Sequence, residues 1–142
     1  MIVRTLDQII GTARDVGAQT WTSRRLLLKE DGMGFSLHET LVRAGTETSM
    51  WYKHHVEAAY CIEGEGEVEV VPSGAVYPIA PGTVYALDQH ERHLLRATSD
   101  LRLVCVFNPP CTGREVHDAE GAYPLLEEEP RQGPSLAESG KS

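Results

Sequence analysis

The sequence predicts an all-β fold, a closed barrel or jelly roll with one short N-terminal helix and a flexible C-terminal tail. From about Arg24 onward, short runs rich in Val, Ile, Leu, Tyr and Thr recur, separated by Gly, Pro and Asp. No second helical periodicity follows the first turns of the chain. The last residues contain few apolar side chains that a core could bury.

The length predicts a single domain. A chain of 142 residues is long enough to bury most of its apolar surface around one core. Residues 127–142 are acid-rich at first and then rich in Pro, Gly and Ser. We therefore expect one domain over residues 1–126 and a flexible tail over residues 127–142.

The N-terminal helix is predicted from its cap. Thr5 and Gln8 have the spacing of a capping box, and Leu6, Ile9 and Ile10 follow helical spacing until a glycine ends the pattern. This helix is expected to serve packing and not chemistry.

The strands are predicted from β-rich runs between turn residues. They cover Arg24–Leu28, Gly34–Val42, Ser49–Lys53, Ala58–Glu63, Glu65–Val71, Thr83–Leu87, His93–Ala97 and Leu101–Asn108. Eight short strands of this kind are typical of a barrel or jelly roll.

Alternation along two of these strands assigns their faces. Ser36, His38 and Thr40 share the polar side of the strand 34–42, which a barrel could turn inward toward a ligand. The strand 101–108 carries an apolar side made of Leu101, Leu103, Cys105 and Phe107.

Charge and composition exclude several classes of function. The net charge is −8, and the 13 basic residues are scattered, which argues against a nucleic-acid surface. No apolar run approaches the length of about 18 residues that a membrane span needs. The first ten residues show no signal or transit pattern, so the cytoplasm is the expected location. Three cysteines without CxxC spacing predict neither a disulfide framework nor a thiolate zinc site.

Two short motifs resemble those of the cupin barrel. Glu57 is followed by six residues and Gly64, and the later motif runs through Pro81 and Gly82 to Tyr85. A typical cupin holds its metal with two histidines and a glutamate from the first motif and a further histidine from the second. Here a tyrosine takes the second motif's histidine position, and the pair His54-His55 is out of register.

Longer stretches make the match more specific. Residues 51–57, 60–69, 104–110 and 112–118 resemble the ectoine synthase family, and the resemblance extends to about residue 126. It implies an Fe(2+) site built from Glu57, Tyr85 and His93. One carboxylate, one phenolate and one imidazole form a three-ligand site that suits divalent first-row metals. Taken alone, the tyrosine is more often a core aromatic and the histidine a surface residue.

The resemblance also implies which residues surround a substrate. The substrate-binding set comprises Trp21, Arg25, Thr40, Cys105 and Phe107, and the catalytic set comprises Tyr52, Glu115 and His117. Core packing explains the cysteine and the phenylalanine equally well, and the arginine could form a surface ion pair. The segment with Glu115 and His117 is interpreted as a lid over the barrel mouth, with a solvated loop as the alternative. His54 and His55 are not expected to bind metal, because neighbours on a strand point to opposite faces.

The implied activity is cyclisation of N-γ-acetyl-L-2,4-diaminobutyrate to ectoine with loss of water, by a homodimer. Two alternatives stay open from the sequence. An iron-dependent dioxygenase would also need open metal positions, although oxygenases generally use two or three histidines. A barrel that only binds a small molecule is possible on any such fold.

Overall fold

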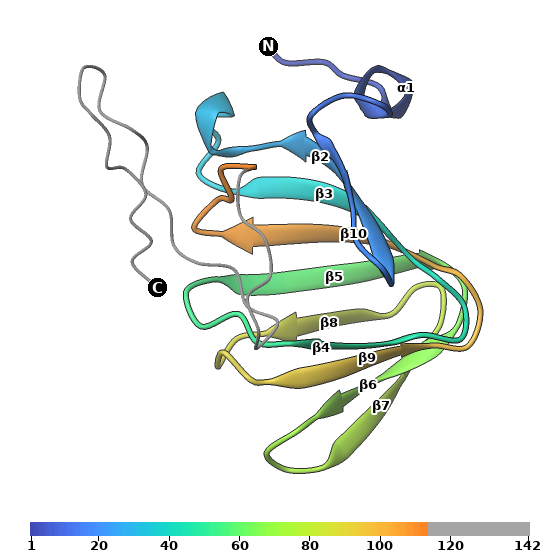
Figure 1. Cartoon of the computed structure of the whole chain (residues 1–142). Helices are drawn as coiled ribbons and strands as arrows, with labels where there is room; N and C mark the ends of the chain where they lie inside the picture. Colours follow the sequence, from blue (N-terminus) through green and yellow to red (C-terminus); the bar gives the residue numbers. More distant parts are fainter. Residues whose placement is uncertain (114–142) are drawn as a thin grey trace.

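The computed structural model describes residues 1–113 as two antiparallel sheets preceded by one short helix (Figure 1). In chain order its elements are α1 (Leu6–Ile9), β1 (Asp15–Gly17), β2 (Trp21–Leu27), the 3-10 helix η1 (Lys29–Asp31), β3 (Ser36–Val42), β4 (Glu47–Met50), β5 (Val56–Glu63), β6 (Gly66–Val70), β7 (Ala75–Ile79), β8 (Val84–Leu87), β9 (His93–Ala97) and β10 (Leu101–Asn108).

The two sheets face each other and enclose the core. One has six strands in the order β1-β2-β3-β10-β5-β8, and the other has four in the order β4-β9-β6-β7. Ala59 and Leu103 of the first sheet belong to the same buried apolar cluster as Val68 and Leu95 of the second. The all-β, jelly-roll prediction with a short N-terminal helix is confirmed.

The predicted capping box opens the helix. The backbone N–H of Gln8 donates to Thr5 Oγ1 at 3.3 Å, and the N–H of Thr5 donates to Gln8 Oε1 at 2.9 Å. Arg4, just before the helix, pairs with Asp31 at 2.8 Å. These contacts fasten the N-terminus to the turn after β2, away from the interior.

Strand prediction was correct for β9 and β10 and less complete elsewhere. The predicted bounds of β9 and β10 match the structure. Two strands, β1 and β7, were missed. The first has only three residues, and the second contains Pro78, which usually argues against a strand. β7 tolerates the proline because it lies at the edge of its sheet.

The inward faces follow the predicted alternation. Ser36 and His38 are buried, and His38 and Thr40 line an internal pocket. Leu101, Leu103 and Cys105 are buried on the inward side of β10. Within residues 1–113, no helix has the length and apolar character needed to span a bilayer. The predicted tail, residues 127–142, lies outside the described residues.

Candidate active site

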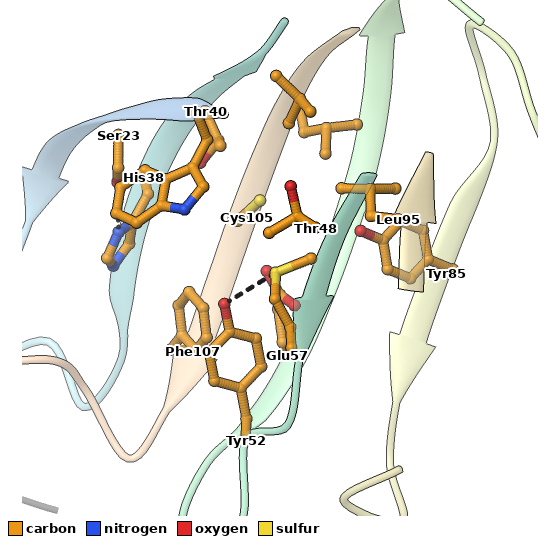
Figure 2. Close-up of a pocket in the computed structure, with 14 residues that line it drawn as sticks. Ser23, His38, Thr40, Thr48, Tyr52, Glu57, Tyr85, Leu95, Cys105 and Phe107 are labelled. Carbon is orange, nitrogen blue, oxygen red and sulfur yellow. Dashed lines mark hydrogen bonds between the residues drawn. The ribbon is translucent and has the colours of Figure 1, made fainter. Parts of the chain in front are cut away.

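A pocket lies inside the barrel, between the two sheets (Figure 2). Its empty space, counted to the open mouth, is about 440 Å³, which is within the usual range for small-molecule sites. Many of the residues predicted for the site line it: Trp21, Thr40, Tyr52, Glu57, Tyr85, Cys105 and Phe107. The sequence therefore predicted a set of residues that the fold brings together.

The three predicted metal ligands come from neighbouring strands of both sheets. Glu57 on β5 and Tyr85 on β8 line the pocket, and their strands pair antiparallel. His93 begins β9 in the opposite sheet and is fully buried. The rings of Tyr85 and His93 have centroids 6.5 Å apart. Tyr85 thus lies beside both of the other predicted ligands, on the strand next to that of Glu57 and in ring contact with His93, although His93 itself does not line the pocket.

The hydrogen bonding of His93 suits a metal ligand. Its Nδ1 lies 3.1 Å from the backbone carbonyl oxygen of Glu91, to which it can donate. Its Nε2 is buried, and no described residue hydrogen bonds with it. A histidine that donates one ring N–H to a carbonyl and leaves the other nitrogen available has the arrangement typical of metal-bound imidazoles.

Burial favours the uncharged forms of all three side chains. It raises the pKa of Glu57 to about 7, against a hydrogen bond from the Cys105 thiol that lowers it. Burial, and then the charge of Glu57, raise the pKa of Tyr85 well above its ordinary value. Burial also lowers the pKa of His93, against the hydrogen bond to Glu91. A bound divalent cation would reverse this preference at the two oxygen ligands, since it stabilises their anionic forms.

The donor set fits a divalent first-row metal. A carboxylate, a phenolate and an imidazole supply borderline-hard ligands and leave coordination positions open. Within the described residues, no three His, Cys, Asp or Glu side chains gather into a cluster that could hold a metal ion. A metal site in this part of the chain would therefore need a donor of another kind, such as Tyr85.

Tyr52 is positioned by the loop between β4 and β5. Trp51 Nε1 donates to the carbonyl oxygen of His90 at 2.9 Å, and His90 Nδ1 lies 2.9 Å from the carbonyl oxygen of Tyr52. The Tyr52 hydroxyl donates to Met50 Sδ at 3.3 Å (Figure 2). Its ring meets Phe107 edge-on, with centroids 5.1 Å apart. The phenol is thereby held inside the pocket.

Arg25 is buried, and it does not line the pocket. Only 2% of its surface is exposed, so the alternative of a surface ion pair is wrong. Its Nε donates to Ser23 Oγ at 3.1 Å, and Nη1 donates to the carbonyl oxygen of Gly113 at 3.3 Å. The adjacent Arg24 forms the ion pair instead, with Glu39 at 2.7 Å.

Ser23 is a pocket residue that sequence reasoning missed, and His38 was recognised only as a member of a polar side. Both line the pocket and are buried. The strand register could have identified Ser23, because Ser23 pairs with Thr40 and Arg25 pairs with His38 across β2 and β3. Because paired residues point to the same face of a sheet, the inward positions of His38 and Thr40 on β3 place Arg25 and Ser23 on the inward face of β2.

The remaining residues that sequence analysis discussed are the histidine pair His54-His55 and the predicted catalytic residues Glu115 and His117. His55 is buried beside Phe107, and its Nδ1 lies 2.9 Å from the carbonyl oxygen of Pro109. Neither His54 nor His55 lines the pocket. Glu115 and His117, together with the predicted lid, lie outside the described residues.

The fold and the pocket together define a cupin-type barrel with an internal, metal-suited site. The chain matches the family model of ectoine synthase over residues 1–127, and it belongs to that family. It is 65% identical to the L-ectoine synthase of Desulfatibacillum aliphaticivorans over 130 residues, which is 90% of this chain and all of that protein. The solved structure of ectoine synthase from P. lautus superposes with a TM-score of 0.81 at 62% identity, covering 94% of this chain and 96% of that one.

More distant likeness concerns the fold alone. A cupin domain of a transcriptional regulator from Enterobacter cloacae matches with a TM-score of 0.55 at 16% identity, over 65% of this chain and 99% of that domain. The predicted family and the predicted cupin barrel are both confirmed by these comparisons.

Proposed function

We propose that this pocket converts N-γ-acetyl-L-2,4-diaminobutyrate into ectoine and water with the help of ferrous iron. The observation that carries the proposal is the family match over residues 1–127, which includes the residues that line the pocket. The α-amine attacks the acetyl carbonyl carbon and closes a six-membered ring through the amide nitrogen. The resulting carbinolamine loses its oxygen as water, and the protons of that water come from the two nitrogens.

Glu57, Tyr85 and His93 would hold the iron. Support comes from the burial of Glu57 and His93 and from the His93 Nε2 atom, which no described residue hydrogen bonds. When bound, the iron would act as a Lewis acid on the amide oxygen. This polarisation matters because an amide carbonyl carbon is a poor electrophile. Cys105 donates a hydrogen bond to Glu57 and helps to keep that carboxylate oriented.

The pocket walls would fold the flexible substrate so that amine and carbonyl meet. Trp21 and Phe107 contribute large apolar surfaces, and Phe107 is fixed between the rings of His38 and Tyr52, with centroids 5.0 and 5.1 Å away. Holding two reacting groups in a near-attack arrangement can lower the barrier by on the order of 7–11 kcal/mol at best. Arg25 would contribute a positive charge behind the wall for the substrate's carboxylate.

Proton transfer needs a base for the α-amine and an acid for the departing hydroxyl group. Tyr52 is within the pocket and close to His93, with ring centroids 5.9 Å apart. Glu115 and His117 complete the proposed set on the strength of the family resemblance. The three are proposed as a group, without separate roles.

The test uses purified full-length protein, loaded anaerobically with ferrous iron and incubated with the acetylated diamino acid. NMR should show the cyclic amidine, and an oxygen electrode in a parallel aerobic sample should show no uptake. Removing the metal with a chelator should abolish turnover, and ferrous iron should restore it. A folded, iron-loaded protein that makes no amidine would contradict the proposal, and oxygen uptake would favour the dioxygenase alternative.

We further propose a cytoplasmic homodimer. Apolar side chains are exposed on the outer face of the six-stranded sheet, where Tyr60 and Val84 pair across β5 and β8 and are 47% and 60% exposed. A second copy would cover such a patch. The three cysteines are free and buried, as is usual in a reducing compartment. Light scattering of the full chain should give twice the monomer mass.

A further inference from the structure

Two loops carry the chain from one sheet to the other at the same end of the barrel. Residues 51–55 connect β4 in the four-stranded sheet to β5 in the six-stranded sheet. Residues 88–92 run the opposite way, from β8 to β9. Met50 at the end of β4 pairs with His93 at the start of β9, and the start of β5 pairs with the end of β8. The two loops therefore cross the same gap between the sheets.

A reciprocal pair of hydrogen bonds joins these loops. Trp51 Nε1 donates to the carbonyl oxygen of His90 at 2.9 Å. His90 Nδ1 lies 2.9 Å from the carbonyl oxygen of Tyr52. Because a carbonyl oxygen can only accept, Nδ1 carries the hydrogen, in the neutral ring and in the charged ring alike. We call these two bonds the Trp51–His90 latch, since both of them tie one loop to the other.

Two further features strengthen the contact between the loops. The Arg92 guanidinium lies over the Trp51 ring, 4.3 Å from its centroid, which adds a cation–π contact from one loop to the other. His90 has a φ of 55°, in the left-handed region that residues other than glycine adopt at a cost. Backbone strain of this kind persists only where the surrounding contacts hold it, and it gathers at functional sites. In this conformation both the carbonyl oxygen and the ring of His90 reach the neighbouring loop.

The latch acts on the backbone of Tyr52, whose side chain lies in the pocket (Figure 2). Tyr52 is only 4% exposed, and its ring contacts Phe107 and His93, with centroids 5.1 and 5.9 Å away. Residues 51–55 lie outside the strand ladders, because the pairing of β4 ends at Met50 and that of β5 begins after the loop. The hydrogen bond from His90 therefore fixes a residue that no strand ladder holds.

We propose that Trp51 and His90 are positioning residues whose latch sets where the Tyr52 hydroxyl stands in the pocket during the proposed cyclisation. The part of Tyr52 in proton transfer rests on the proposed function. Neither latch residue is among the described residues that line the pocket, so both act through Tyr52. His93 is held independently, through the pairing of β9 with β4 and β6. Loss of the latch should therefore displace Tyr52 and leave His93 in place.

The experiment measures kcat, KM and bound iron in full-length variants of His90. His90→Gly accepts the left-handed conformation and lacks the ring, so the bond to Tyr52 is lost. His90→Asn also tolerates that conformation, and its side-chain amide offers a donor near the position of Nδ1. We expect His90→Gly to lower kcat about 3- to 10-fold with KM within about 2-fold, because one hydrogen bond shifts an equilibrium by about that factor. His90→Asn should stay within about 2-fold of the wild-type kcat. Gln89→Ala, an exposed side chain removed from the same loop, is the matched control and should change neither constant.

Two more variants test whether the effect passes through the Tyr52 hydroxyl. Trp51→Phe keeps an aromatic ring beside Arg92 and lacks the indole N–H, so it should also lower kcat about 3- to 10-fold. In protein that already carries Tyr52→Phe, His90→Gly should lower kcat no further, because no hydroxyl is left to position. Bound iron, measured by elemental analysis, should stay at the wild-type level in every variant. The urea midpoint of His90→Gly should match that of the wild type, because relief of backbone strain offsets the lost hydrogen bond.

The outcomes separate this inference from the proposed function. If wild-type protein makes no amidine, the proposed function fails, and the role of the latch in that reaction fails with it. If the wild type is active, a folded His90→Gly variant with wild-type kcat overturns the inference alone. Loss of iron in parallel with activity would also overturn it, since the latch would then act on the metal site. So would an equal effect of His90→Gly with and without the Tyr52 hydroxyl, or a Tyr52→Phe variant with wild-type kcat.

Discussion

The two walls of the pocket differ in how their polar groups are satisfied. On the wall of β2 and β3, Ser23, Ser36 and His38 are buried and hydrogen bonded to one another. On the opposite side, Glu57 lines the pocket and His93 lies buried beside the pocket residue Tyr85, but His93 Nε2 has no hydrogen-bond partner among the described residues. Burial also shifts the pKa values of both of these groups toward their neutral forms.

This difference indicates different roles. A buried network whose members satisfy each other contributes to stability and gives a fixed shape. A buried polar atom without such a partner, as His93 Nε2 is among the described residues, costs stability, and such atoms are often found where a ligand binds. This contrast supports the proposal that one side of the pocket is a preformed surface for the substrate and that the other side holds a metal. The predictions below test this contrast, from the largest expected effect to the smallest.

The largest effect is expected from removing a proposed metal ligand. Tyr85→Phe should lose bound iron and reduce kcat about 100- to 1000-fold or more, because the phenolate is lost from the site. Tyr52→Phe is the matched control, since it removes a hydroxyl from the same pocket and should leave the iron content unchanged. Elemental analysis and the NMR assay measure the two quantities. Equal iron content in both variants would remove Tyr85 from the proposed ligand set.

A smaller effect, on stability, compares one histidine from each wall in protein stripped of metal. His38→Leu should lower the free energy of unfolding by about 2–4 kcal/mol, because Ser23 and Ser36 lose their common partner in the interior. His93→Leu should change it by less than about 1 kcal/mol, since the variant loses one hydrogen bond, from Nδ1 to the Glu91 carbonyl, and also removes the buried Nε2 that has no described partner. Urea denaturation measures both. Similar losses in the two variants would show that the walls do not differ in this way.

The fold was predictable from the sequence where pattern and context agree. The strand Leu101–Asn108 lies between two others in the centre of its sheet, and its alternation of apolar residues was read correctly. β7 was missed because the reason Pro78 is tolerated, its place at a sheet edge, depends on tertiary pairing. The three-residue β1 is too short to give a periodic signal at all.

The sequence predicted many of the residues of the site, but not the hydrogen bonds that connect them. Resemblance to the family supplied residues such as Trp21, Glu57 and Phe107, which do line one pocket. The sequence could not show that Arg25 lies behind the pocket wall and acts on Ser23, because that depends on the register between β2 and β3 and on rotamers. Whether a buried nitrogen such as His93 Nε2 has a partner is likewise a property of packing.

The smallest expected effect is a difference in pH dependence between the two buried histidines and Glu57 in the metal-free protein. The pKa of His38 is lowered to about 3 in the folded state by burial and by Arg25. Below the unfolded value of about 6.5 the unfolded chain binds a proton that the folded protein does not, so stability falls as the pH falls. The depressed pKa of His93 acts in the same direction. The pKa of Glu57 is raised to about 7, so between about 4.5 and 7 the folded protein binds the extra proton, and stability falls as the pH rises.

These opposing contributions should partly cancel between about pH 4.5 and 6.5, which gives the metal-free wild type a shallow profile. Glu57→Gln removes only the second contribution, since its amide carries no titratable proton. The variant should therefore lose stability toward acid more steeply than the wild type, by on the order of 1 kcal/mol per pH unit. Urea midpoints measured at several pH values with chelator present give both slopes. Parallel profiles would mean that Glu57 is ionised in the metal-free protein despite its burial, and the contrast between the walls would then rest on hydrogen bonding alone.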